Sequence, residues 1–136
     1  MKSRLRARAR GEDGAAVVEF VLISALVMGL LLAVLQVAVY VHARNVVAAS
    51  AQEGARYAAN ADVDSAAGAA RTLDIVRRSL GEATADGLVC DSAEEVDTTG
   101  LVLVVVQCTG AVPALFGALG DLLRVNATGR AIKEGQ

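Results

Sequence analysis

The sequence predicts an α+β protein in which a long N-terminal membrane-spanning helix continues into an exported stalk, followed by one helix packed on a small antiparallel three-stranded sheet. Three observations lead to this class. The stretch from Phe20 to Val41 has no charged residue, and as a helix it would be about 33 Å long, enough to cross hydrocarbon about 30 Å thick. Helix-compatible composition continues to Ala59 without a proline. Beyond Asn60 the pattern changes to a short amphipathic segment and then to strand-like stretches.

The first helix is expected to run unbroken from Ala15 to Ala59, because only Gly29 and Gly54 strongly disfavour a helix there. It would be about 68 Å long, so its far end would lie well outside the membrane as a stalk. Small side chains recur in the stalk at steps of three and four residues, which allows another segment to approach closely. Packing against the chain's own exported part and packing between subunits are both open explanations. The stripe comprises Val46, Val47, Ser50, Ala51, Gly54, Ala55 and Ala58.

Charge asymmetry predicts the orientation of this helix. The N-terminal leader is basic, and the first basic residue after the apolar run is Arg44. Short flanks rich in Lys and Arg stay in the cytoplasm, so the N-terminus is expected inside and the C-terminal part outside. Basic arms also bind nucleic acid, but five positive charges beside a membrane-length run are more typical of a topology signal, and no nucleic-acid partner is expected. The basic residues of the leader are Lys2, Arg4, Arg6, Arg8 and Arg10.

Glu19 is an acidic residue at the edge of the apolar region, where an ionised carboxylate is costly and therefore a candidate functional group. The alternative is a tolerated charge at the start of the helix. Cleavage between Gly14 and Ala15 would create an amino group that is largely protonated at neutral pH. This group would lie one helical turn from Glu19. In an assembly, Glu19 could pair with the amino group of a neighbouring subunit, and a buried pair of this kind fixes register more than it adds stability.

Two motifs carry a resemblance to a known family. Gly14, Ala15, Glu19 and Phe20 resemble the processing site of type IV pilins and pseudopilins, in particular of the Flp/Tad group, in which glycine is followed by four residues, glutamate, and tyrosine or phenylalanine. Residues 45–60, NVVAASAQEGARYAAN, resemble the segment that follows the membrane helix in TadE-like proteins. Its core is Glu53, Gly54, Ala55, Arg56 and Tyr57. The end of the chain is similar too, with a Pro-containing hydrophobic link from Gly110 to Gly120 and a final strand ending RAIKEGQ.

The resemblance implies a TadE/TadF-like pseudopilin of the tight-adherence type IV pilus, with a type IV pilin-like fold. It implies a cytoplasmic leader at 1–14, a transmembrane and stalk helix at 15–60 and an extracytoplasmic head at 61–136. The processing partner would be a prepilin peptidase in the cytoplasmic membrane, and the assembly partners would be other Tad pseudopilins and the Flp pilin. A minor subunit is expected, because the main Flp pilins are little more than a helix and this chain carries a folded head.

The residues after Asn60 predict the head. Asp62 or Asp64 is expected to cap a helix that ends near Leu80, with Gly81 as its stop. Strands are expected at Leu88–Asp91, Leu101–Cys108 and Leu123–Arg130, the second covered on both faces and the third half-buried. The buried face of the helix is expected to hold Val63, Ala66, Ala67, Ala70, Leu73 and Leu80, and Arg71 and Arg78 are expected to face solvent.

Cys90 and Cys108 both lie in the exported part, where an even number of cysteines favours a disulfide. Such a bridge would close a loop of 17 intervening residues and contribute about 3 kcal/mol in the loop-entropy model. The alternative is a pair of buried free thiols. For a domain of about 76 residues, a contribution of this size would matter.

Catalysis, metal binding and small-molecule substrates are not expected, and no cofactor is predicted. The single histidine, His42, has no second histidine with which to form a metal site. Two other functions stay open beside a pseudopilin. Signal peptidase could cut after Ala43, at the small-residue site Val41-His42-Ala43, and release a secreted globular binding protein. Without any cleavage, the chain would be a plain single-pass membrane-anchored protein.

Overall fold

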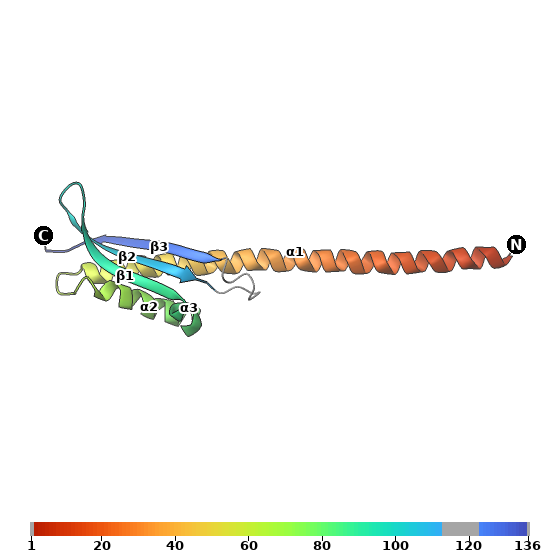
Figure 1. Ribbon diagram of the computed structural model, residues 1–136, viewed down its shortest axis with the longest axis horizontal. Coiled ribbons are helices and arrows are strands. Elements are labelled where there is room, and N and C mark those ends of the chain that lie inside the picture. Colours follow the sequence, from red (N-terminus) through yellow and green to blue (C-terminus); the bar gives the residue numbers. More distant parts are fainter. Residues whose placement is uncertain (1, 113–122, 136) are drawn as a thin grey trace. The chain divides into compact units, whose positions relative to one another are not determined.

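The computed structural model describes the backbone of residues 2–112 and 123–135, and side chains from Gly14 onward. The chain has the predicted α+β class: a long apolar N-terminal helix followed by helix and a three-stranded antiparallel sheet (Figure 1). The elements are α1 (Lys2–Ala59), α2 (Ala67–Leu80), α3 (Glu82–Asp86), β1 (Leu88–Val96), β2 (Val102–Ala111) and β3 (Arg124–Ile132).

The chain divides into two compact units, Met1–Val37 and Ala38–Gln136. Helix α1 supplies the whole described part of the first unit and continues into the second. The prediction of one unbroken helix to Ala59 is confirmed, and the helix also includes the leader from Lys2. The second unit therefore contains the predicted stalk as well as the strands and the shorter helices.

The sheet has the order β1-β2-β3 with both pairs antiparallel. The alternation expected in the last strand is confirmed, because Val125 and Ala127 are buried while their neighbours Arg124 and Asn126 are exposed. In the first strand, the prediction of four residues at Leu88–Asp91 was too short. The strand continues to Val96 because its acidic second half pairs along the apolar residues of β2, with Glu94 opposite Val104. Tertiary pairing here overrides the low strand propensity of charged residues.

The central strand β2 is the most buried part of the sheet. Val104, Val105 and Val106 are consecutive and all buried, but the expected coverage of both faces does not extend along the strand, because Gln107 and Thr109, on the same face as Val105, are exposed. Helix α2 and the part of α1 from Ala38 lie on one face of the sheet, so the second unit has two layers (Figure 1). The core between them consists of Ala43, Val47, Ala51, Ala55, Val76, Ala85, Leu88, Val106, Cys108, Val112, Val125 and Ala127.

The prediction for α2 was wrong at its start. The helix begins at Ala67, and Asp64 organises the turn before it: its carboxylate accepts from the N–H of Ala66 and its carbonyl from the N–H of Ala67, both at 2.9 Å. The predicted end of α2 is confirmed, because Gly81 adopts a φ of 93° and donates its N–H to the Arg77 carbonyl at 3.1 Å. The short helix α3 that follows was not predicted.

The buried face of α2 also differs from the prediction. Its buried residues are Gly68, Thr72 and Val76, and Ala66 and Ala70 are exposed. Arg78 is exposed as expected, but Arg71 is half-buried, with its guanidinium 5.5 Å from the centre of the Tyr57 ring. The face is set by where α1 and the sheet approach α2 closely, since a Cβ added at Gly68 would lie 2.8 Å from a methyl carbon of Val106 and 3.2 Å from the Cβ of Ala58.

The predicted Pro-containing link lies mostly outside the described residues, in 113–122. Its flanking residues are joined, because Val112 donates its N–H to the Leu123 carbonyl at 3.2 Å. The strands on either side are also paired, with Ala111 opposite Arg124.

Candidate functional site

The predicted processing segment lies in the first unit. Gly14, Ala15, Glu19 and Phe20 are all helical and exposed, and the side chain of Phe20 is 72% exposed. A Cβ added at Gly14 would meet nothing within 4 Å. Because Ala15 and Glu19 are four residues apart in a regular helix, they share a face, one turn above the other. The side chains of the segment therefore have no packing role within the chain.

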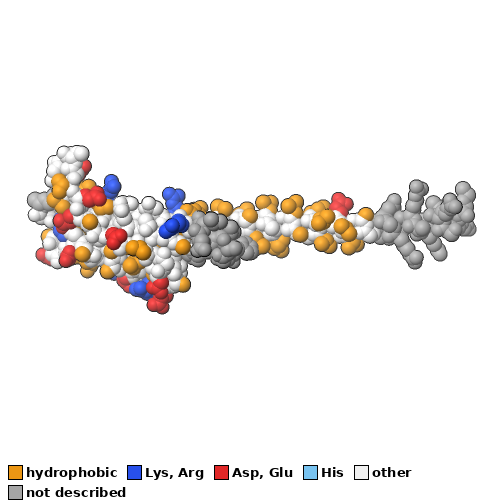
Figure 2. All heavy atoms as spheres, in the orientation of Figure 1, with side chains coloured by type: hydrophobic (Ala, Val, Ile, Leu, Met, Phe, Trp, Pro, Cys, Tyr) orange, Lys and Arg blue, Asp and Glu red, His pale blue; other side chains and the backbone are white. Residues whose placement is uncertain are grey.

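Most of the apolar run is exposed: every residue from Phe20 to Leu35 except the half-buried Leu32 is exposed, whereas Gln36 is buried and Tyr40 is half-buried. Large hydrophobic side chains at successive positions, such as Val17, Leu26 and Val37, are each more than half exposed, and hydrophobic side chains cover this part of the helix in Figure 2. Gly14–Ala59 is a candidate membrane span by its length and composition. A stretch of 18 residues within it has a mean hydropathy of 2.7 and contains no buried residue. A helix that is apolar all round needs an apolar environment, and the described residues of the chain do not supply one here.

The stripe of small residues in the stalk has a different role. Val47, Ala51, Ala55 and Ala58 are completely buried within the second unit, together with Ser50 and Gly54. Of the two explanations open for the stripe, packing against the chain's own exported part is the one that the structure contains. Large exposed hydrophobic residues on the first part of α1 thus give way to small buried residues on the part that packs within the second unit.

Two glycines show how closely the elements approach. A Cβ at Gly54 would lie 2.0 Å from the Thr72 hydroxyl oxygen and 2.5 Å from the Gly68 carbonyl oxygen. A Cβ at Gly129 would lie 2.2 Å from the Ala51 carbonyl oxygen, so β3 rests directly on the backbone of α1. Both contacts exclude any side chain, and together they fix α1 against α2 on one side and β3 on the other.

Gln52 joins α1 to the edge of the sheet. Its side-chain amide donates to the Arg130 carbonyl at 2.6 Å and accepts from the Arg130 N–H at 3.2 Å. The side chain thus pairs with both backbone groups of one residue of β3, much as another strand would. The sequence carried no signal for Gln52, because its partner lies 78 residues away and contributes only backbone atoms.

The five residues of the predicted stalk motif divide between two roles. Gly54 and Ala55 are buried, whereas Glu53 and Arg56 are exposed. None of the ion pairs among the described side chains joins Glu53 to Arg56, although the two residues are three apart on the helix. Tyr57 contacts Arg71 of α2 through its ring. Part of the motif is therefore structural: it holds the exported end of α1 against α2.

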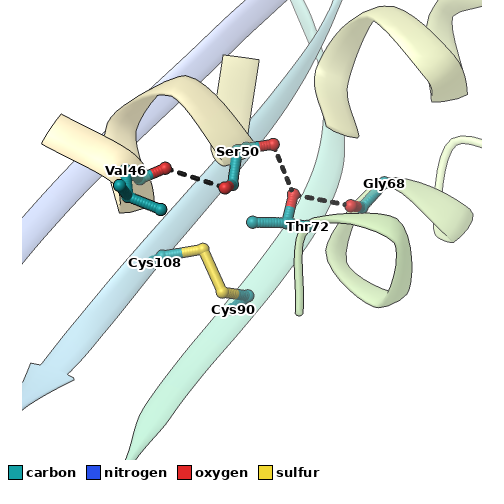
Figure 3. Close-up of a disulfide and its surroundings, with 6 residues drawn as sticks. All are labelled: Val46, Ser50, Gly68, Thr72, Cys90 and Cys108. Carbon is teal, nitrogen blue, oxygen red and sulfur yellow. Dashed lines mark hydrogen bonds between the residues drawn. A yellow bond between two sulfur atoms is a disulfide. The ribbon is translucent and has the colours of Figure 1, made fainter. Parts of the chain in front are cut away.

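The disulfide between Cys90 and Cys108 is confirmed. The two cysteines are directly opposite in the β1–β2 register rather than at strand ends as expected, and Cys108 is completely buried. The bridge lies close to the contact between α1 and α2 (Figure 3). There the buried Thr72 hydroxyl is 2.9 Å from the Gly68 carbonyl oxygen and 3.3 Å from that of Ser50, and Ser50 donates to the Val46 carbonyl at 2.7 Å.

Lys133 is a further structural residue that the sequence did not indicate. Its ammonium donates to the Ala58 carbonyl at 3.1 Å, the Val63 carbonyl at 2.7 Å and the Ser65 hydroxyl at 3.1 Å. It also lies 3.8 Å from a carboxylate oxygen of Glu94. One side chain after β3 therefore connects the end of α1, the turn before α2 and the strand β1.

Replacing Lys133 by methionine is expected to lower the free energy of unfolding of the second unit by about 2 kcal/mol, because hydrogen bonds to a charged, largely buried group are lost together. Chemical denaturation of the full chain in detergent would measure the change. Arg130→Met is the matched control, since it removes an exposed positive charge from the same strand and is expected to change stability by less than about 0.5 kcal/mol. Equal effects of the two substitutions would contradict the role given to Lys133.

Residues 14–56 match the family model described as TadE-like protein. This segment of the chain is TadE-like. The match begins at the glycine of the predicted processing site and ends within the stalk motif, at Arg56, so the resemblance stated from these motifs is confirmed over this range. The family indicates involvement in Tad pilus systems and association with their machinery in the membrane. No curated protein matches the chain, and no solved structure matches it.

The TadE-like segment thus contains both the exposed apolar helix and the buried part of the stalk. Among the residues that the structure describes, no group of three or more His, Cys, Asp or Glu side chains could hold a metal ion. The features that stand out are surfaces for a membrane and for packing, in line with a family associated with pili.

Proposed function

We propose that this chain is a minor pilin or pseudopilin that takes part in assembly of Flp/Tad pili after a prepilin peptidase removes residues 1–14. The observation that carries the proposal is the coincidence of three features at one place. The TadE-like match begins at Gly14, the basic leader precedes it, and a helix whose large apolar side chains are mostly exposed follows it. A single-pass protein with a cytoplasmic N-terminus and an extracytoplasmic C-terminal part would present the leader to a peptidase at the inner face of the membrane.

Cleavage would change the chemistry of the helix end. The peptide bond between Gly14 and Ala15 is replaced by a protonated amine at Ala15, on the helical face that carries Glu19. Carboxylates near a helix N-terminus are stabilised by the helix dipole. In lipid, the amine of one subunit and Glu19 of the next would compensate each other's desolvation, which would set the register between neighbouring helices. The partners would be other Tad pseudopilins and the Flp pilin.

The core of the second unit favours this proposal over release by signal peptidase. A cut after Ala43 would remove Ala43, which is 1% exposed in the hydrophobic core, and Tyr40, which packs against the same core. The hydroxyl of Tyr40 also donates to the Arg124 carbonyl at 3.2 Å. The released product would therefore lack part of its own core, whereas cleavage at Gly14 leaves the second unit intact.

Replacing Gly14 by leucine is expected to abolish maturation, because a peptidase pocket that accepts only a hydrogen side chain would reject it. Gly29→Leu is the matched control. A Cβ meets nothing within 4 Å at either position, so neither substitution disturbs packing within the chain, and only Gly14 lies at the expected cut. Intact mass of protein from native membranes would show a mature N-terminus at Ala15 in the wild type and in Gly29→Leu, and the full leader in Gly14→Leu. A mature N-terminus at Arg44, or normal maturation of Gly14→Leu, would contradict the proposal.

Replacing Glu19 by glutamine is expected to leave the chain in the membrane but to reduce its incorporation into pili at least tenfold, because the neutral amide no longer compensates the amine of a neighbour. The exposed side chain contributes nothing to packing within the chain, so stability should not change. Quantitative mass spectrometry of sheared pili and of membranes would measure the partition. Wild-type levels of the variant in purified pili would count against the pairing, whereas loss from the membrane would reveal a role in insertion.

A further inference from the structure

The end of the second unit that lies nearest the apolar run carries two exposed arginines. Arg44 is one helical turn beyond Tyr40 on α1. Arg124 is the first residue of β3 and is far away in the sequence, but the hydrogen bond from the Tyr40 hydroxyl to its carbonyl brings it to the same end. We refer to Tyr40, Arg44 and Arg124 as the basic end.

The arginines of the basic end are not engaged by acids within the described part of the chain. The ion pairs there involve Arg71, Arg77, Arg78 and Lys133, and neither Arg44 nor Arg124 is among them. Arg77 lies between Glu82 and Asp86, at 3.9 and 4.0 Å, which compensates the acids of α3. Among the residues that the structure describes, no acid therefore neutralises the basic end.

The opposite end of the same unit has the opposite charge. The end of β1, the hairpin after it and the turn before α2 meet there, joined by Lys133. Three basic residues, Arg56, Arg130 and Lys133, accompany six acids at this end. The acids are Asp62, Asp64, Glu94, Glu95, Asp97 and Glu134. An anionic surface would therefore attract one end of the unit and repel the other.

We propose that the basic end binds the phosphate groups of anionic phospholipids at the membrane surface where α1 emerges. The basic end directly follows the apolar run, so Arg44 reaches the headgroup layer as soon as α1 leaves hydrocarbon. Tyr40 supplies the amphipathic ring that is typical of this layer. Guanidinium groups bind phosphate oxygens through paired N–H donors. The proposal rests on the proposed function only in requiring that α1 spans a membrane.

Arg124 has room for a headgroup beside it. A hollow of about 420 Å³ borders this residue and is lined also by Gly87, Val89, Thr109 and Gly110. Thr109 offers a second hydrogen-bonding group, and Val89, which is 65% exposed, offers an apolar surface. A headgroup phosphate bound at Arg124 would attach the start of β3 to the bilayer. This contact would add to the covalent connection through α1.

The test uses full chain in detergent micelles supplied with equal amounts of phosphatidylglycerol and phosphatidylcholine, with retained lipids counted by native mass spectrometry. We expect the wild type to retain phosphatidylglycerol preferentially. The double variant Arg44→Gln/Arg124→Gln is expected to lower that preference roughly 30-fold, because each arginine near an anionic surface contributes about fivefold. Neither substitution removes the bond from Tyr40, which goes to the backbone of Arg124.

The matched control is Arg56→Gln/Arg130→Gln, which also removes one exposed arginine from α1 and one from β3, but away from the basic end. It is expected to keep the wild-type preference. An equal loss in the control, or no preference in the wild type, would overturn the proposal. Displacement of the lipid by millimolar inorganic phosphate would show a site for free anions and would also overturn the proposal. Pilus assembly that depends on Arg44 and Arg124 without any lipid preference would assign these arginines to a protein partner and would overturn it as well.

The same samples separate this proposal from the proposed function. Maturation at Gly14 without a preference for phosphatidylglycerol would overturn only the lipid site. Retention of the leader with a preference that depends on Arg44 and Arg124 would overturn only the processed pseudopilin.

Discussion

Replacing Gly54 by alanine is expected to destabilise the second unit by about 3 kcal/mol, at the upper end of the usual cost of overpacking. The added methyl group would overlap the Thr72 hydroxyl and the carbonyl oxygen of Gly68. The threonine could rotate, but the carbonyl belongs to the backbone of α2 and could yield only if the whole helix moved away. That movement would also separate Thr72 from Ser50 and open the core around Val76.

Hydrogen exchange of the β2 amides in the full chain would measure this effect, because the central strand exchanges only when the unit opens. Protection is expected to fall roughly 100-fold in Gly54→Ala. Gly29→Ala is the matched control on the same helix, since its Cβ would meet no atom within 4 Å and alanine favours the helix. Protection of β2 in Gly54→Ala equal to that of the wild type would show that α1 and α2 are not held at this distance.

The double replacement Cys90→Ala/Cys108→Ala is expected to cost about 3 kcal/mol of unfolding free energy. The bridge joins residues 18 apart in sequence and so restricts the unfolded chain, and truncation of the buried Cys108 would add the cost of a small cavity. Such a loss is a large part of the stability available to a small domain.

Denaturant unfolding with and without dithiothreitol would isolate the contribution of the bridge. Dithiothreitol should lower the stability of the wild type by a similar amount and leave that of the double variant unchanged. Two thiols that react with an alkylating agent before any reductant is added would contradict the bridge, and so would a wild type insensitive to reduction under denaturing conditions.

The contacts between α1 and α2 explain why the stalk motif contains Gly54 and Ala55. The glycine of EGARY is required because α2 crosses α1 there without space for a methyl group, and the alanine beside it is buried in the core. Glu53 and Arg56 point away from these contacts and are exposed, although they belong to the same short motif. Within the stalk motif, residues buried in the core and residues exposed on the surface therefore alternate with the period of the helix.

Several features followed from local patterns alone. The apolar run, the absence of proline and the small residues of the stalk predict one long helix, since each property acts within a few turns. The alternation of Val125 and Ala127 with polar neighbours predicts a half-buried strand for the same reason. The pairing of Cys90 with Cys108 followed from the expectation that both cysteines lie in an oxidising compartment, since the chain has only these two.

Other features depended on tertiary structure. Three features involve backbone atoms that are far away in the sequence: the buried face of α2, the hydrogen bonds of Gln52 to Arg130 and the contacts of Lys133. Every residue type has the same backbone atoms, so the sequence does not indicate which of them will be contacted. The sequence by itself determined the long apolar helix, the order of the main helices and strands, and the disulfide. Only the tertiary structure decided which side of each element is buried and which charges remain exposed, because those depend on how closely two backbones approach.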